Sequence, residues 1–263
     1  MESPIFSSFR HNNVVIIGCK IMSPDVRIFS DIRTLTECVA QSMKDSINQI
    51  DRSGQYLLAL AGGNTPRALY QLLAENYADK IDWASVQLFW GDERYVSTSD
   101  SRSNFRMVQE TLLRHVPIPT NQIHPMPTNY QDPNDAAHAY EITLRKYFHS
   151  MWPRFNLMIL GLGSDGHTAS IFPGSISSED KRWVVATQAP TEPKQRLTLT
   201  LPVLSNSERV FFIVTGSDKA NALERTLSRD VEVQRCPAAG VYQKNASVIF
   251  WTDKDASKLL GLS

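Results

Sequence analysis

Residues 56–66 read YLLALAGGNTP, a continuous apolar run followed by two glycines, an asparagine and a Thr-Pro pair. A run of this length and composition is typical of a strand that is buried on both faces, as in a parallel sheet. Thr65 can serve as the N-cap of a helix, and Pro66 can be its first residue, because the first helical turn leaves its N–H groups unused. The stretch therefore predicts a strand, a tight turn and a helix in succession.

Strand and helix patterns alternate along the rest of the chain. Short apolar runs predict strands at 26–29, 86–90, 155–160, 209–215 and 247–251, with weaker candidates at 183–187 and 197–201. Apolar residues spaced by three and four predict helices from Ser30 or Asp31 to Gly54, at 104–115, at 133–149, at 218–227 and, briefly, at the C-terminus. We therefore expect an α/β fold with a mainly parallel, doubly wound, Rossmann-like sheet and helices on both faces. Ligands of such sheets bind beyond the carboxyl ends of the strands.

The composition excludes several classes of function. The chain has 27 Lys and Arg residues against 27 Asp and Glu residues. We expect neither nucleic acid nor an anionic membrane as a partner, because both require a basic field. No apolar stretch is long enough to cross a bilayer. The three cysteines, Cys19, Cys38 and Cys236, are few and far apart, which argues against a disulfide framework and favours a reducing, cytoplasmic compartment. A poorly marked targeting segment in the first 25 residues is the alternative.

Two segments that follow predicted strands suit a phosphate group. The turn formed by Gly62, Gly63, Asn64 and Thr65 brings backbone N–H groups and a helix N-terminus together, although an ordinary strand-to-helix turn would have the same pattern. Arg94 follows the strand at 86–90 and could grip a phosphate with its planar fork. The alternative for Arg94 is a solvated loop in which it pairs with a neighbouring carboxylate, Asp92 or Glu93.

The strongest local signal is the loop after the strand at 155–160, which reads GLGSDGHTAS at 161–170. His167 can take a proton from water near neutral pH, and Asp165, two residues earlier, can orient the imidazole and stabilise its charged form. A structural hydrogen bond is the alternative for such a histidine. The loop also matches the dinucleotide fingerprint Gly-x-Gly-x-x-Gly, but the acidic residue expected about 20 positions later could only be Glu179 or Asp180, which precede the next strand.

Two further cations lie next to predicted strands. Arg196 precedes the strand candidate at 197–201, and Lys219 follows the strand at 209–215. Most Arg and Lys side chains are surface charges. These two gain a role only if the fold brings them to the same pocket as Arg94.

Taken together, these segments resemble the 6-phosphogluconolactonase family. The matching pieces are Gly62-Gly63-Asn64-Thr65-Pro66, Trp90-Gly91-Asp92-Glu93-Arg94, Ser103-Asn104, the loop from Gly161 to Gly174, Arg196-Leu197-Thr198-Leu199-Thr200-Leu201-Pro202, Gly216-x-x-Lys219-Ala220 and Pro237-Ala238. They occur in the order of the family across roughly residues 26–255. The resemblance implies a single α/β domain over 26–263, preceded by an N-terminal extension at 1–25.

The resemblance also implies an activity. It implies an enzyme of the oxidative pentose phosphate pathway that hydrolyses a small phosphorylated lactone, 6-phospho-D-glucono-1,5-lactone, to 6-phospho-D-gluconate. We expect His167 to act as the general base, with Asp165 orienting it or only fixing the loop, and backbone N–H groups of a glycine-rich loop to hold the oxyanion. Arg94, Lys219 and the Gly62–Thr65 turn would bind the phosphate, with Arg196 in a less direct contact. No cofactor and no metal are expected, and the oligomeric state is left open.

The sequence departs from the family in places, and rival functions follow from related proteins. Asn64 stands where family members often carry serine, and 97–99 lack the expected proline; neither departure touches the loop with His167, so both bear on binding detail more than on activity. Amino-sugar-phosphate deaminases share the Asp-Gly-His element but continue with Asn-Glu-Pro, whereas 170–174 here carry no carboxylate. Three alternative functions remain. In order, they are a deaminase or isomerase on the same fold, a non-catalytic sugar-phosphate sensor, and a dinucleotide-dependent oxidoreductase.

Overall fold

The structure is a computed structural model that describes residues 24–50, 54–175, 180–228, 230–245 and 247–261. The expected N-terminal extension at 1–25 lies almost entirely outside the described residues, as do Cys19 and Glu179. Among the residues that are described, no helix is both long and apolar enough to cross a membrane.

The main sheet is parallel throughout. Its strands are β1 (Asp25–Phe29), β2 (Tyr56–Leu60), β3 (Val86–Trp90), β5 (Ile123–His124), β6 (Leu157–Leu160), β9 (Val210–Val214) and β10 (Val248–Asp253), in the order β1-β10-β9-β6-β2-β3-β5. From β2 the chain moves outward to β3 and β5, then returns to the other side of β2 with β6 and continues to β9 and β10. The strand order therefore reverses between β2 and β6, which is where an open α/β sheet forms a crevice for ligands.

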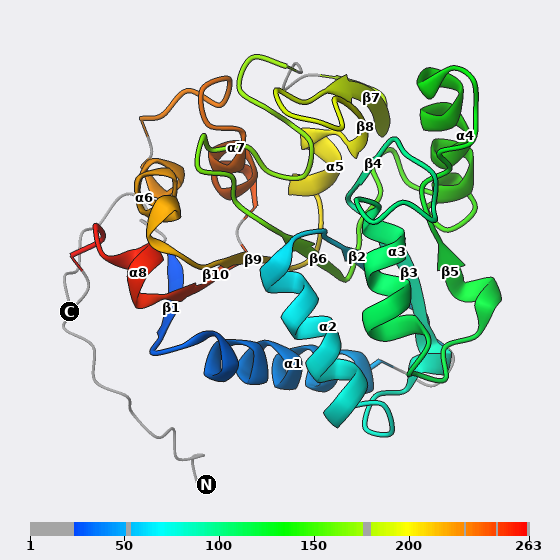
Figure 1. The fold of residues 1–263 in the computed structure, drawn as a ribbon, viewed down its shortest axis with the longest axis horizontal. Coiled ribbons are helices and arrows are strands. Elements are labelled where there is room, and N and C mark those ends of the chain that lie inside the picture. The colour runs from blue at the N-terminus through cyan, green and yellow to red at the C-terminus, as the bar shows by residue number, and fades with distance from the viewer. Residues whose placement is uncertain (1–23, 51–53, 176–179, 229, 246, 262–263) are drawn as a thin grey trace, which may run out of the picture.

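Helices cover both faces of this sheet. Their bounds are α1 (Ile32–Asn48), α2 (Asn64–Asn76), α3 (Asn104–Val108), α4 (Pro133–Arg145), α5 (Leu201–Ser205), α6 (Ala220–Leu227), α7 (Pro237–Lys244) and α8 (Lys254–Ser257), with a π-helical turn η2 (Gln109–Leu113) after α3 and short 3₁₀ turns η1 (Trp83–Ser85), η3 (Thr120–Gln122) and η4 (Ser217–Lys219). In Figure 1, α1 and α2 lie on one side of the strands, and α6 and α7 lie on the other. The predicted doubly wound α/β fold is confirmed.

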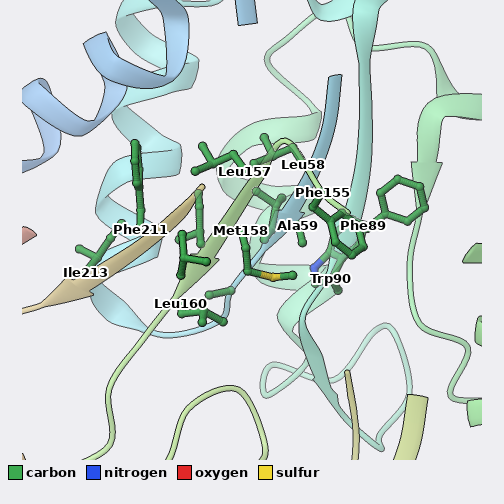
Figure 2. Close-up of a cluster of buried hydrophobic side chains, with 14 of the residues drawn as sticks. Leu58, Ala59, Phe89, Trp90, Phe155, Leu157, Met158, Leu160, Phe211 and Ile213 are labelled. Atoms are coloured by element: carbon green, nitrogen blue, oxygen red, sulfur yellow. The ribbon is translucent and has the colours of Figure 1, made fainter. Parts of the chain in front are cut away.

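The core lies between the sheet and these helices. Figure 2 shows side chains of the four central strands packed together, among them Leu58 of β2, Phe89 of β3, Met158 of β6 and Phe211 of β9. Each of these four side chains is at most 1% exposed. Their burial on both faces explains why the sequence of each strand is a continuous apolar run.

A second, antiparallel sheet adjoins the carboxyl end of β3. It consists of β4 (Asp92–Arg94), β8 (Gln195–Leu199) and β7 (Val184–Gln188), in the order β4-β8-β7. The two weaker strand candidates, 183–187 and 197–201, are thus strands of a separate sheet. The alternative in which the charged residues 92–94 form a solvated loop is wrong, because their backbone pairs with β8.

Helix boundaries differ from the sequence expectations at several points. α1 is capped by Asp31, whose carboxylate accepts from the N–H of Thr34, but it ends at Asn48 instead of Gly54. The N-cap of α2 is Gly63 and not Thr65. Gly63 has a φ of +108°, which glycine adopts without a Cβ penalty. The predicted helix at 104–115 turns from α to π at Gln109, and the predicted helix at 133–149 ends at Arg145.

Candidate active site

A cavity of about 470 Å³ lies at the carboxyl ends of β2, β3, β6 and β9, at the point where the strand order reverses. Most of the predicted site residues line it, namely Gly62, Gly63, Asn64, Thr65, Arg94, His167 and Lys219. Asp165 and Arg196 contact residues of this group but do not line the cavity themselves. Segments about 150 residues apart in the sequence therefore meet at one place.

His167 and Asp165 form a hydrogen-bonded pair in the loop after β6. Nδ1 of His167 lies 2.6 Å from Oδ1 of Asp165, and the same oxygen accepts from the backbone N–H of His167 at 3.0 Å. Nε2 of the imidazole has no hydrogen-bond partner among the described residues, so it is the nitrogen available to accept a proton. Burial raises the pKa of the Asp165 carboxyl, but the backbone N–H and the positive charge of His167 outweigh this, so the net pKa is below its ordinary value.

The imidazole is confined by the residues around it. The ring centroid of Phe172 lies 4.7 Å from that of His167. A Cβ at Gly163 would lie 2.0 Å from Nδ1 of His167. The backbone of the loop is closed by two hydrogen bonds, from Gly163 N–H to the carbonyl of His167 and from Gly166 N–H to the carbonyl of Gly163. The loop therefore fixes the ring in one place at the cavity wall.

The N-terminus of α2 faces the same cavity. Its first residues, Asn64 and Thr65, line the cavity, and no side chain caps the helix. The N–H groups of the first turn of a helix have no partner within the helix, and they carry the positive end of its dipole. The hydroxyl of Thr65 bonds instead to that of Thr215 after β9, at 2.8 Å. This helix start is suited to bind an anion.

Arg94 and Arg196 lie opposite each other on β4 and β8. Nη1 of Arg94 donates to the carbonyl of Arg102 at 2.8 Å, and the Nε atoms of both arginines are buried without a hydrogen-bond partner. Neither guanidinium forms an ion pair with a described carboxylate, so the alternative in which Arg94 pairs with Asp92 or Glu93 is wrong. Burial, and next to it the charge of Arg94, lowers the pKa of Arg196. Two adjacent cations that form no ion pair with a described carboxylate favour an anionic ligand.

Lys219 supplies a third cation from the side of β9. Its ammonium lines the cavity and forms an ion pair of 3.0 Å with Asp218. Asp218 is largely exposed, so a bound anion can compete for the lysine. The cations of β4 and of the turn after β9 thus border the same cavity as the imidazole.

Four polar residues at this site, Asp92, Glu93, Asn104 and Ser170, were not among the predicted site residues. Asp92 and Asn104 line the cavity, and the carboxylate of Asp92 accepts from the hydroxyl of Ser170 at 2.6 Å. The side-chain amide of Asn104 donates to the backbone carbonyl of Asp92 at 2.9 Å. Glu93 is buried behind this pair. The sequence signal for these residues was the run of three charges, Asp92, Glu93 and Arg94, directly after a buried strand. The run does not show which partner each charge binds, because that depends on the fold.

The structure disfavours the dinucleotide-binding alternative for the loop after β6. A dinucleotide fingerprint requires a helix directly after its glycines. Residues 161–175 contain turns and an isolated bridge between Thr168 and Ile171, but no helix. In the described part of the chain, no three His, Cys, Asp or Glu residues are grouped so that they could hold a metal ion.

The chain was compared with known protein families. Residues 30–251 match the family described as glucosamine-6-phosphate isomerases/6-phosphogluconolactonase. The chain belongs to this family. The resemblance seen in the sequence is therefore confirmed, and the family has members that act by isomerisation as well as by lactone hydrolysis.

Several relatives within the family cover nearly the whole chain. A 6-phosphogluconolactonase of Synechocystis is 36% identical, over 91% of this chain and 99% of its own. A 6-phosphogluconolactonase of Mycobacterium tuberculosis is also 36% identical with the same coverage. Among solved structures, 6-phosphogluconolactonase from Leishmania guyanensis superposes with a TM-score of 0.80 at 28% identity, covering 91% of this chain and 99% of that one.

Proposed function

We propose that this protein is a 6-phosphogluconolactonase, which hydrolyses 6-phospho-D-glucono-1,5-lactone to 6-phospho-D-gluconate in the oxidative pentose phosphate pathway. The observation that carries the proposal is that His167, hydrogen-bonded to Asp165, borders the same cavity as Arg94, Lys219 and the N-terminus of α2. A base and several cations that line one cavity suit an ester that also carries a phosphate. The relatives in Synechocystis and Mycobacterium tuberculosis, which bear this name over nearly the same length, support it.

The phosphate is bound first. Arg94 and Lys219 supply positive charge, and the Gly62–Thr65 turn supplies N–H groups at the start of α2. A planar guanidinium and free backbone N–H groups both match the tetrahedral oxygens of a phosphate. Arg196 adds positive potential from behind Arg94 on β8. Phosphate binding at this end places the lactone carbonyl toward the imidazole.

His167 then activates water. Nε2 takes one proton from a water molecule while the water oxygen forms a bond to the lactone carbonyl carbon. Asp165 holds Nδ1 and stabilises the imidazolium that results. Backbone N–H groups of a glycine-rich loop hold the negative charge on the carbonyl oxygen. The tetrahedral intermediate collapses by breaking the bond between the carbonyl carbon and the ring oxygen, which receives the proton from the imidazolium and leaves as a hydroxyl.

A turnover assay tests the proposal. Freshly made 6-phosphogluconolactone is added to the purified protein, and acid release is compared with the spontaneous rate. We expect enzymatic release, and His167→Ala should lower kcat by about 10²–10⁴-fold, as is typical when a general base is removed. Release at the spontaneous rate, or near-normal turnover by the variant, would contradict the proposal.

The same preparation distinguishes the rival within the family. An amino-sugar-phosphate deaminase would release ammonia from glucosamine 6-phosphate. We expect no release of ammonia, because residues 170–174 lack the carboxylate of the Asn-Glu-Pro element of the deaminases. In this chain, Ser170 in that stretch donates its hydroxyl to Asp92.

A further inference from the structure

Glu93 is a buried carboxylate that the proposed reaction does not use. It lies on β4 between the two cavity residues Asp92 and Arg94, and its side chain points to the other face because side chains alternate along a strand. The residue is 2% exposed. No described Lys or Arg forms an ion pair with it. Burial of a charge is costly unless hydrogen bonds compensate it, so its partners indicate its role.

All four partners of the Glu93 carboxylate are donors. Oε1 accepts from the backbone N–H groups of Arg94 and Asn104, each at 2.7 Å. Oε2 accepts from the N–H of Phe105 at 2.7 Å and from the hydroxyl of Ser103 at 3.2 Å. Ser103 already caps α3, since its hydroxyl accepts from the N–H of Arg106. The carboxylate therefore adds a connection between β4 and the start of α3 that the cap alone does not provide.

This connection holds two residues of the cavity wall. Oε1 joins the backbone of Arg94 directly to that of Asn104. The guanidinium of Arg94 is held further by the carbonyl of Arg102, in the loop between β4 and α3. The side chain of Asn104 bonds to the backbone of Asp92 and occupies the space beside Gly62, where a Cβ would lie 1.9 Å from its Oδ1. Arg94, Asn104 and the turn before α2 therefore share one support.

We infer that Glu93 is a positioning residue: through its ionised carboxylate it ties β4 to α3 and so holds Arg94 and Asn104 in the geometry that binds the phosphate of the substrate. This inference rests on the proposed function, because that function assigns the phosphate to this end of the cavity. It concerns binding and not the proton transfer at His167, so the two can be tested apart.

The ionisation of Glu93 gives the inference a second readout. Burial is the main cause that raises the pKa of this carboxyl, to about 7, and the charge of Asp92 adds to it, while the three N–H donors oppose it. The other titratable groups that interact electrostatically with it are Arg196 on β8 and Tyr140 on α4. Arg102 and Arg106, in the loop before α3 and on α3, are engaged by Asp100 and Glu110.

Protonation disrupts the arrangement of donors. A protonated carboxyl has one O–H where four neighbouring groups all need acceptors, so the hydrogen-bonding pattern between β4 and α3 changes as the pH falls below about 7. Glutamine imitates this state at every pH, because it replaces one oxygen with an NH₂ donor. Glu93→Gln should therefore resemble the wild type at low pH and differ from it at high pH.

The test measures binding of 6-phosphogluconate by calorimetry at pH 8 and pH 6. At pH 8 we expect Glu93→Gln to weaken binding about 10-fold or more, as is usual when a hydrogen bond to a charged group is lost. The gap between variant and wild type should narrow at pH 6, and the ionisation of the ligand itself affects both proteins equally. Equal dissociation constants at pH 8, or the same gap at both pH values, would overturn the inference.

Glu141→Gln is the matched control. Its carboxylate accepts from the backbone N–H of Trp183 at 2.9 Å and pairs with Arg145, away from the cavity. This variant should bind 6-phosphogluconate like the wild type at both pH values. If the wild type and Glu93→Gln differ in 6-phosphogluconate binding as expected, but the wild type hydrolyses no lactone, the proposed function alone is contradicted. A wild type that does not bind 6-phosphogluconate would overturn the inference about Glu93.

Hydrogen exchange in the wild type provides a test that needs no variant. After correction for intrinsic exchange rates, protection of the Asn104 and Phe105 amides should change between pH 8 and pH 6, because the carboxylate that accepts from both amides titrates in this range. The amide of Trp183, held by Glu141, should keep its protection. Unchanged protection at Asn104 and Phe105 would contradict a pH-dependent connection, even if Glu93→Gln failed to fold.

Discussion

At the scale of single residues, the position of the imidazole depends on an absent side chain. A Cβ at Gly163 would lie 2.0 Å from Nδ1 and 2.2 Å from Cε1 of His167, and 2.6 Å from Oδ1 of Asp165. These atoms belong to the ends of side chains, which can move without unfolding the loop. Gly163→Ala should therefore displace the ring from the water that it activates and leave the fold intact.

The expected result is a fall in kcat of about 10²-fold, which a displacement of about 1 Å can cause. Steady-state kinetics together with a thermal melt checks this, because KM and the melting temperature should change little. A variant with wild-type kcat would show that the imidazole does not need its observed position.

Residue types alone predicted only part of this site. His167 and Asp165 are close in sequence, so their pairing could be expected from the loop that contains them. The partners of Asp92 could not, because Ser170 lies 78 residues further along the chain. Arg196 is a similar case, since only the pairing of β4 with β8 places it opposite Arg94. Long-range pairings of this kind depend on topology, which a local pattern does not contain.

At the scale of elements, the long strands of the main sheet follow the apolar runs of the sequence, because burial on both faces requires apolar residues at every position. β4 has no such signal: its three residues are all charged, and its pairing with β8 overrides their low strand propensity. The N-cap of α2 falls at Gly63 instead of Thr65, and the hydroxyl of Thr65 bonds to that of Thr215. β5, α5 and α7 are short elements that the pattern did not predict.

The contact between the turn before α2 and the start of α3 leads to a prediction at this scale. A Cβ at Gly62 would lie 1.9 Å from Oδ1 and 2.4 Å from Cγ of Asn104, whose side chain is buried. Gly62→Ala should therefore separate the two helix starts. We expect a loss of about 1–3 kcal/mol in the free energy of unfolding, as for other overpacked sites, together with a higher KM for the phosphorylated lactone.

Gly91→Ala is the control for the stability change. A Cβ at Gly91 would meet its nearest atom, the carbonyl oxygen of Leu60, at 3.6 Å, which is an ordinary contact. Urea denaturation of both variants compares the two glycines directly. Equal losses of stability would show that the contact between Gly62 and Asn104 is not tight.

At the scale of the whole molecule, the reversal of strand order between β2 and β6 creates the crevice, and the small antiparallel sheet brings two arginines to its edge. The buried Nε atoms of Arg94 and Arg196 have no hydrogen-bond partner among the described residues, and each guanidinium raises the potential at the other. The fold therefore carries a local electrostatic cost that an anion would relieve.

The melting temperature should report how far a bound anion relieves this electrostatic cost. For the wild type, 6-phosphogluconate at 100 times its dissociation constant should add about 2.7 kcal/mol to the free energy of unfolding, which corresponds to a rise in Tm of about 5–10 °C. Arg196→Met removes one of the two cations and keeps much of the side-chain volume. Without ligand it should melt at the wild-type temperature or above it, because replacement of a buried charge by an apolar side chain is often neutral or stabilising. At the same ligand concentration its rise in Tm should be smaller.

Arg33→Met is the control, since it removes an exposed arginine paired with Glu37. Its melting temperatures with and without ligand should equal those of the wild type. If Arg196→Met lowered the melting temperature of the free protein and kept the full rise with ligand, Arg196 would be supporting the small sheet and not the anion.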